Sequence, residues 1–330
     1  FLGNAGTAVR FLTAAVALVD GKTIVTGDEH MQKRPIEPLL ETLRAMGVDT
    51  HSDTGCPPVV VNGIGTFQNG EITVSGKLSS QYISAIMMLA AMGDAETRIK
   101  IGGGKIGAVG YLHITAAVMR AFGATVSFPS ESEIVVQPGG YTAATYPVEP
   151  DASAATYLWG MEKLTGGAID IGILPEDMNQ PDAKAYDMIA ACPNMPATIN
   201  GSQMQDEVPT LAVLAAFNET PVRFVGIENL RVKECDRIEA VHKGLTAIRP
   251  DLATVEGDDL IVQGDPQLAG EQRDCLIDSY ADHRIAMSFA LAALRVPGVK
   301  IEDPDCVSKT FPSYWDVLRG LGVSVEIERP

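Results

Sequence analysis

Several basic side chains stand where the sequence predicts that a helix begins. They are Arg34, Arg231, Lys233, Arg237, Arg284 and Lys309. A helix N-terminus carries partial positive charge, so a cation there costs the helix roughly 0.3–1 kcal/mol, whereas an anion is stabilised. Arg also offers paired hydrogen bonds to carboxylate or phosphate. The arrangement predicts a site for anionic ligands; the alternative is a set of solvated charges and ion pairs.

Three acid–base candidates lie close to these cations, namely Asp206, Glu234 and His283. A carboxylate surrounded by cations stays ionised, which suits a general base. Taken singly, each residue could equally be a helix cap or an ion-pair partner. The other four histidines show no spacing typical of metal ligands, and we expect no metal site.

The tripeptide Ser79-Ser80-Gln81 lies between an apolar strand-like stretch, residues 72–74, and an apolar helical stretch. Two hydroxyl groups beside free backbone N–H groups could hold a phosphate. The sequence equally fits plain N-capping by Ser.

A glycine-rich segment, Gly102–Gly107, matches the G-x-G-x-x-G pattern of dinucleotide-binding loops. The same place in the other repeats of this chain carries no glycine cluster, and Ile106 stands where a P-loop needs Ser or Thr. We therefore set nucleotide binding aside.

A repeat organises the elements that must position these side chains. Helices of small apolar residues recur after short polar turns. Gln81 lies 74 residues after Thr7 and 74 before Ala155, and Arg284 lies 74 residues after Thr210. Second helices end at a glycine and lead into alternating stretches such as 323–327. Each repeat therefore predicts strand, helix, strand, helix, strand, strand. Five copies indicate an α/β fold; chance similarity within an ordinary α/β chain is the alternative.

The segment Tyr146–Pro150 contains two prolines between the second and third copies. It predicts a boundary between an upper domain, residues 1–147, and a lower domain, residues 148–330.

Composition limits the classes of function. The chain has 330 residues, 46% of them hydrophobic, and a formal charge of −17, with no basic stripe to bind nucleic acid. Its longest nearly apolar runs, Ile83–Met92 and Ile285–Leu294, are too short to cross a membrane. Five scattered cysteines indicate reduced thiols in the cytoplasm. Because Phe1 opens the chain in the middle of a motif, we expect an N-terminal truncation.

Six motifs carry a resemblance to a known family. They are Leu2–Arg10, Lys33–Ile36, Leu78–Tyr82, Arg231–Arg237, Asp282–Arg284 and Lys309–Pro312. In this order, over essentially the whole chain, they resemble the 3-phosphoshikimate 1-carboxyvinyltransferases (EPSP synthases). The related UDP-N-acetylglucosamine 1-carboxyvinyltransferases would carry a catalytic cysteine in the upper domain, and no cysteine lies near Arg34.

The resemblance implies a two-domain, inside-out α/β fold of six βαβαββ repeats that closes over a cleft, with five repeats present here. It implies transfer of the enolpyruvyl group of phosphoenolpyruvate to the 5-hydroxyl of shikimate 3-phosphate, with release of phosphate. This reaction belongs to the shikimate pathway toward chorismate and aromatic amino acids. We expect a cytoplasmic monomer without cofactor or metal.

The resemblance also assigns roles residue by residue. Shikimate 3-phosphate would contact Ser79, Ser80, Gln81, Tyr111, Asp206, Asn229 and Lys233. Phosphoenolpyruvate would contact Asn4, Gly6, Arg34, Gln81, Arg237, Arg284 and Lys309. Asp206 would take the hydroxyl proton, while Glu234, Lys309 and His283 would serve protonation of the methylene carbon and departure of phosphate. Gly6 would leave room for the inhibitor glyphosate.

Some family features are missing. The phosphoshikimate-binding Lys-Ser and Arg of the first repeat are absent, and Ala108 stands where many members have Ser. We therefore expect these 330 residues to be inactive alone. The alternatives are transfer to UDP-N-acetylglucosamine and a non-catalytic, anion-binding relative.

Overall fold

The computed structural model describes residues 1–75, 79–102 and 109–328. The chain divides into two compact units, Phe1–Val148 (unit 1) and Glu149–Pro330 (unit 2). Ala108 and most of the glycine-rich segment, residues 103–107, lie outside the described residues. None of the described helices is long and apolar enough to cross a membrane.

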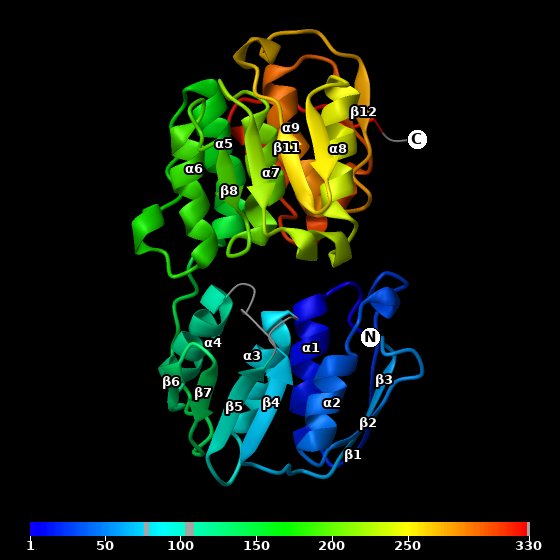
Figure 1. Cartoon of the computed structure of the whole chain (residues 1–330), viewed down its shortest axis with the longest axis vertical. Coiled ribbons are helices and arrows are strands. Elements are labelled where there is room, and N and C mark those ends of the chain that lie inside the picture. Colours follow the sequence, from blue (N-terminus) through cyan, green and yellow to red (C-terminus); the bar gives the residue numbers. More distant parts are fainter. Residues whose placement is uncertain (76–78, 103–108, 329–330) are drawn as a thin grey trace. The chain divides into compact units, whose positions relative to one another are not determined.

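Unit 1 contains two successive repeats (Figure 1). The first consists of α1 (Gly6–Ala15), β1 (Gly21–Val25), α2 (Glu37–Ala45), β2 (Asp49–His51) and β3 (Val59–Gly63). Its three strands form an antiparallel sheet in the order β1-β3-β2. The second consists of β4 (Glu71–Ser75), α3 (Ser80–Ala90), β5 (Thr97–Gly102), α4 (Val109–Ala121), β6 (Val126–Ser130) and β7 (Glu133–Val136). Its sheet has the order β4-β5-β7-β6, with β4 and β5 parallel.

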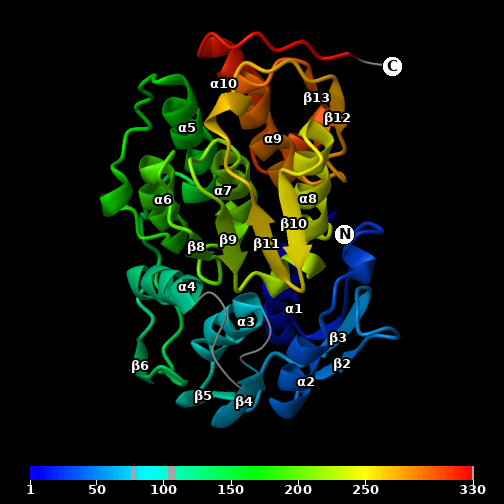
Figure 2. The ribbon, with the colours of Figure 1, turned by 45° about the horizontal axis from the view of Figure 1, so that its top comes forward.

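Unit 2 begins with two helices, α5 (Ala152–Thr165) and α6 (Ala185–Ala191). A full repeat follows: β8 (Thr198–Asn200), α7 (Val208–Ala215), β9 (Val222–Val225), α8 (Arg237–Ile248), β10 (Ala253–Glu256) and β11 (Asp259–Val262). Figure 2 shows its strands side by side in the order β8-β9-β11-β10. The last elements are β12 (Cys275–Ile277), α9 (His283–Arg295), β13 (Val299–Ile301) and α10 (Tyr314–Gly320), with β12 and β13 parallel.

The predicted α/β architecture is confirmed, but the repeats differ in completeness. The repeats β4–β7 and β8–β11 contain all six predicted elements in the same strand order. The prediction of a strand at residues 323–327 is wrong, because this stretch pairs with no strand among the described residues and forms no ladder. The side chains of Val323 and Val325 still alternate toward the core of unit 2 and pack against it.

The first helices of the repeats form the centre of each unit. All eight residues of α7 are buried, as are nine of eleven in α3 and nine of thirteen in α9. Ala, Ser and Thr are frequent in these helices, which lets neighbouring helices approach closely. Burial of Leu211 and of Leu214 stabilises the fold by about 1.5–3 kcal/mol each. Rigid helices of this kind hold their N-terminal residues in fixed positions.

Helix caps fix the starts of these elements. Asp236 accepts a hydrogen bond from the backbone N–H of Glu239 at the start of α8, and Asp282 accepts one from Arg284 at the start of α9. Ser79 caps α3 in the same way, through the N–H of Gln81. The caps therefore fix Arg237 as the first residue of α8, and Arg284 and Gln81 as the second residues of α9 and α3.

Candidate active site

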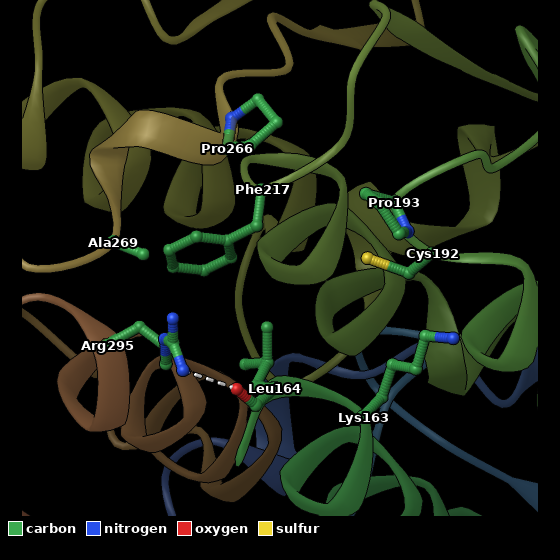
Figure 3. Close-up of a pocket in the computed structure, with 8 residues that line it drawn as sticks. All are labelled: Lys163, Leu164, Cys192, Pro193, Phe217, Pro266, Ala269 and Arg295. Carbon is green, nitrogen blue, oxygen red and sulfur yellow. Dashed lines mark hydrogen bonds between the residues drawn. The ribbon is translucent and has the colours of Figure 1, made fainter. Parts of the chain in front are cut away.

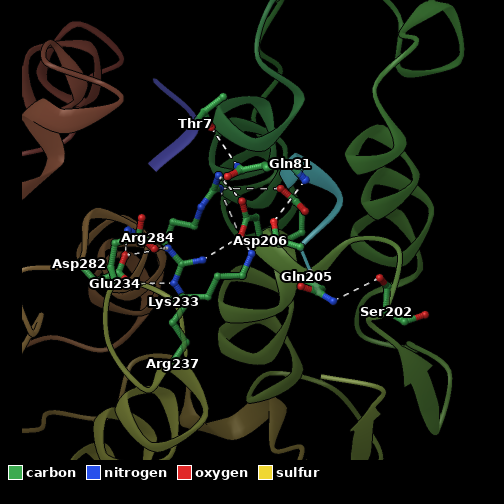
Figure 4. Close-up of polar contacts among 12 residues, drawn as sticks. Thr7, Gln81, Ser202, Gln205, Asp206, Lys233, Glu234, Arg237, Asp282 and Arg284 are labelled. Carbon is green, nitrogen blue, oxygen red and sulfur yellow. Dashed lines mark hydrogen bonds and ion pairs between the residues drawn. The ribbon is translucent and has the colours of Figure 1, made fainter. Parts of the chain in front are cut away.

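Arg237 is the centre of a polar cluster in unit 2 (Figure 4). Its guanidinium is only 1% exposed and donates to three carboxylates: Nε to Asp282 at 2.7 Å, Nη1 to Asp206 at 2.8 Å and Nη2 to Glu234 at 2.8 Å. Burial opposes the charge of Arg237, but Asp282, Asp206 and Glu234 outweigh this effect and raise its pKa. Arg237, the first residue of α8, thus binds three carboxylates at once.

Asp206 contacts three cations. Besides Arg237, the Nζ atom of Lys233 lies 3.3 Å from its carboxylate, and Nη2 of Arg284 lies 3.0 Å away. Burial works against ionisation of Asp206, but Arg284, Lys233 and Arg237 outweigh it, and the pKa of this carboxyl lies well below its usual range. A quarter of the side chain is still exposed. Asp206 is therefore an ionised carboxylate that is still partly open to solvent.

Glu234 links the cluster to a fourth cation. One carboxylate oxygen accepts from Arg237, and the other lies 2.7 Å from Nζ of Lys309. Lys309 is the last residue of the 3₁₀ turn Pro304–Lys309. It lies 75 positions after Glu234 in the sequence. A carboxyl and an ammonium in contact form a pair that can hold and move a proton.

His283 is neutral in this environment. Burial lowers its pKa to about 4, and the nearby cations Arg284, Arg237 and Lys309 act in the same direction, against Asp282. The side chain is 3% exposed, and its Nδ1 lies 3.6 Å from Asp282. His283 can therefore exchange hydrogen bonds at neutral pH without adding charge.

The lowered pKa of His283 predicts a pH dependence of stability. The unfolded imidazole takes up a proton as pH falls through 6.5, but the folded one does so only near pH 4. Folding is therefore stabilised above pH 6.5, and about 3 kcal/mol is lost as pH falls from 6.5 to 4. Urea unfolding across this window should show a smaller loss in a His283→Gln variant; equal losses in both proteins would refute the assignment.

The prediction that the basic residues begin helices is wrong for Arg231 and Arg34. Arg231 is held by Asp236 at 2.9 Å and Asp258 at 2.7 Å, which makes it part of the structure around α8. Arg34 follows the 3₁₀ turn Met31–Lys33, three residues before α2. Of the six basic residues, only Arg237 and Arg284 lie in the first turn of an α-helix. Two of the six basic residues therefore lie at a helix start.

Unit 1 contains a second, smaller polar cluster around Gln81. Its amide nitrogen donates to Thr7 at 2.9 Å, and its amide oxygen accepts from Arg10. The guanidinium of Arg10 also lies 5.1 Å from the ring centre of Tyr82, a cation–π contact. Arg10 is almost fully buried in a helix of small apolar residues, α1. Arg10 is not among the site residues that the sequence predicts; a cation within a run of small apolar residues is the signal that could have indicated its burial.

Gly6 and Asn4 lie against Arg34. Nη1 of Arg34 donates to the side chain of Asn4 at 3.4 Å, and a Cβ atom on Gly6 would lie only 2.9 Å from the same nitrogen. Gly6 is the first residue of α1, so the absence of a side chain there lets Arg34 pass close to the helix start.

A Gly6→Ala substitution should move Arg34. Because the crowded atoms belong to the end of a flexible side chain, we expect the unfolding free energy to change by less than about 1 kcal/mol. Binding of an anion by Arg34 should instead weaken about tenfold. Calorimetry with phosphoenolpyruvate and the full-length protein measures this effect. Gly320→Ala is the control, since a Cβ there meets open space; equal affinities in both variants would contradict the prediction.

The remaining predicted residues occupy helix or turn positions. Ser79 is the cap of α3, and Ser80 is its buried first residue. Tyr111 is half-buried in the first turn of α4, and Asn229 is half-buried in the 3₁₀ turn Glu228–Val232. Within residues 1–75, 79–102 and 109–328, no three His, Cys, Asp or Glu side chains gather closely enough to hold a metal ion.

A cavity of about 170 Å³ lies elsewhere in unit 2 (Figure 3). Its residues are Lys163, Leu164, Cys192, Pro193, Phe217, Pro266, Ala269 and Arg295. Both cations are already used: Lys163 donates to the carbonyl of Ala190 at 2.7 Å, and Arg295 donates to that of Leu164 at 2.7 Å. They stabilise helix C-termini, and the cavity takes no part in the polar cluster.

Comparison with known proteins gives the family of this chain. The profile of the family described as EPSP synthase (3-phosphoshikimate 1-carboxyvinyltransferase) matches residues 1–318. The 3-phosphoshikimate 1-carboxyvinyltransferase of Rhizobium leguminosarum bv. trifolii is 63% identical over 99% of this chain and 78% of its own length. That of Pseudomonas syringae pv. syringae is 58% identical over the same shares.

A solved structure is also similar. The EPSP synthase of Acinetobacter baumannii superimposes with a TM-score of 0.77 at 25% identity, over 99% of this chain and 79% of that protein. Sequence identity over nearly the whole chain and a shared architecture thus point to one family. The chain belongs to the EPSP synthase (3-phosphoshikimate 1-carboxyvinyltransferase) family.

Proposed function

We propose that this protein transfers the enolpyruvyl group of phosphoenolpyruvate to the 5-hydroxyl of shikimate 3-phosphate, with release of phosphate. This is the EPSP synthase reaction of the shikimate pathway. One observation carries the proposal. In a chain of this family, Arg237, Lys233 and Arg284 keep the carboxylate of Asp206 ionised, and its side chain is partly exposed. Such a group fits the base that the reaction needs.

The addition step requires two proton movements. The 5-hydroxyl oxygen bonds to C2 of phosphoenolpyruvate while Asp206 takes the hydroxyl proton, and the methylene carbon, C3, gains a proton to become a methyl group. In the second step the C2–phosphate bond breaks, and the methyl group returns a proton to form the enol ether. The contact between Glu234 and Lys309, at 2.7 Å, supports their role at C3 and at the leaving phosphate.

The unit 2 cluster contains four cations that anionic ligands could contact: Lys233, Arg237, Arg284 and Lys309. Each of the four cations in the unit 2 cluster contacts a carboxylate of the protein. A ligand phosphate or carboxylate can replace such a contact without leaving a cation unpaired. Cations held in advance also stabilise the charge that develops on the departing phosphate.

The binding residues are proposed as two sets. The set for shikimate 3-phosphate is Ser79, Ser80, Gln81, Tyr111, Asp206, Asn229 and Lys233. The set for phosphoenolpyruvate is Asn4, Gly6, Arg34, Gln81, Arg237, Arg284 and Lys309. Within unit 1, Gln81 contacts Thr7 and Arg34 contacts Asn4, which supports the inclusion of Gln81, Arg34 and Asn4 in these sets. Arg237 would have to give up one of its three carboxylate contacts to reach the ligand.

Turnover assays test the proposal. Phosphate release by the full-length protein is measured with phosphoenolpyruvate plus either shikimate 3-phosphate or UDP-N-acetylglucosamine, and mass spectrometry identifies the product. We expect turnover with shikimate 3-phosphate only. Turnover with the sugar nucleotide, or with neither acceptor, would overturn the proposal in favour of the related transferases or of a non-catalytic relative.

We also propose that the protein acts as a monomer in the cytoplasm. The five cysteines are free thiols, which fits a reducing compartment. Light scattering after gel filtration measures the mass in solution.

A further inference from the structure

Glu207 is a buried acid that the proposed reaction does not use. It ends the 3₁₀ turn Gln205–Glu207, directly before α7, and its side chain is 0% exposed. Neither carboxylate oxygen accepts a hydrogen bond from an N–H or hydroxyl group among the described residues. An ionised carboxylate without such donors is expensive to bury. Glu207 therefore needs another means of losing its charge.

A second buried acid faces it. Asp182, in the 3₁₀ turn Pro181–Lys184, is 2% exposed and lies within hydrogen-bonding reach of Glu207. Two carboxyl groups in contact, shielded from water, cannot both be ionised. Burial, and after it Asp182, raises the pKa of Glu207 well above its usual range. Burial and mutual contact therefore favour one shared proton over two ionised carboxylates.

The other charged and titratable groups around Glu207 come from three elements. Nη1 of Arg284, on α9, lies 3.8 Å from Oε1 of Glu207, and Asp206 precedes Glu207 in the same turn. The hydroxyl of Tyr157, on α5, is buried where the charges of Arg284 and Glu207 act on it. Arg284 is the cation that lies beside Glu207, and it also contacts the carboxylate of Asp206; Arg237 acts on Tyr157 as well.

We propose that Glu207 and Asp182 share one proton and act as positioning residues. The pair then carries a single negative charge beside the guanidinium of Arg284, which orients Arg284 and leaves it able to bind an anion. This inference rests on the proposed function of Arg284 in binding phosphoenolpyruvate. Glu207 and Asp182 themselves touch no substrate. Their shared proton determines how much of the charge of Arg284 remains for the ligand.

The pair predicts an alkaline loss of affinity. When the shared proton leaves, a second negative charge arises 3.8 Å from the guanidinium of Arg284. The KM for phosphoenolpyruvate should then rise about tenfold, whereas kcat at saturation should change little, because a charge at this distance acts on ligand binding.

The test compares pH profiles of the full-length protein. Steady-state kinetics from neutral to alkaline pH are measured for the wild type, Glu207→Gln and Asp182→Asn. Each amide keeps the shape of the pair but leaves only one titratable carboxyl, so both variants should lack the alkaline rise in KM. Glu176→Gln, an exposed residue of unit 2, is the control and should retain it. A rise of equal size in all four proteins would overturn the proposal.

Infrared spectroscopy gives a readout that needs neither activity nor a variant. With carbon-13-labelled glutamate and aspartate, the wild type should show the band of a protonated carboxyl at neutral pH and lose it at alkaline pH. A fully ionised spectrum at neutral pH would refute the shared proton. If turnover itself is absent while the band is present, the proposed function fails and the proton-sharing pair stands.

Discussion

Replacing Asp206 by Asn should lower kcat about 10²–10⁴-fold, the usual contribution of a positioned general base. The amide cannot take the hydroxyl proton, and it also removes the negative charge shared by Arg237, Lys233 and Arg284. Because cations remain, binding of shikimate 3-phosphate should be retained. Steady-state kinetics and calorimetry of the full-length protein measure the two quantities separately.

The matched control is Asp187→Asn, an exposed acid on α6 of the same unit. It should leave kcat unchanged. If Asp206→Asn also keeps the wild-type kcat, Asp206 is no base in this reaction. If binding and kcat are lost together, Asp206 contributes to ligand binding and its role in proton transfer is unsupported.

Replacing Arg237 by Met should lower the unfolding free energy by about 3–5 kcal/mol at pH 7, because three carboxylates lose their shared cation. The largest part of this loss should come from Asp282, because it is fully buried. Burial raises the pKa of its carboxyl, but Arg237 outweighs this effect and holds the pKa below the usual range. Urea denaturation followed by circular dichroism measures the loss.

Arg319→Met provides the comparison for Arg237. Arg319 pairs with Asp316 at 2.8 Å, but both side chains are largely exposed, and such pairs contribute about 0–1 kcal/mol. The two variants remove the same charge from unit 2. Similar losses of stability in both would show that the cluster around Arg237 does not hold the fold together.

The buried helices could be predicted closely from the sequence. Apolar runs that follow a polar turn, at residues 154–164 and 285–294, predict helices, and the structure has Ala152–Thr165 and His283–Arg295 there. Runs of small apolar residues after a polar cap are local signals. Cap and helix together then place Asp282 and Arg284, which is why two of the charged residues followed directly from local sequence.

The rest of the site depends on contacts between distant segments. Lys309 reaches Glu234 from the end of a 3₁₀ turn, and no periodicity in its own segment indicates that contact. Glu207 looks like the second residue of an acidic turn, and its burial opposite Asp182 follows only from packing. The stretch 323–327 has the alternation of a strand but lacks a partner among the described residues, and a strand needs one.

A structure of the full-length protein with shikimate 3-phosphate and phosphoenolpyruvate, or a stable analogue of the latter, would show whether Asp206 is placed to act as the base. We expect the 5-hydroxyl of shikimate 3-phosphate within hydrogen-bonding distance of the carboxylate of Asp206, and the anionic groups of phosphoenolpyruvate on Arg284 and Lys309. Ligands bound elsewhere, with the carboxylates of Asp206 and Glu234 still paired only to protein cations, would contradict the account.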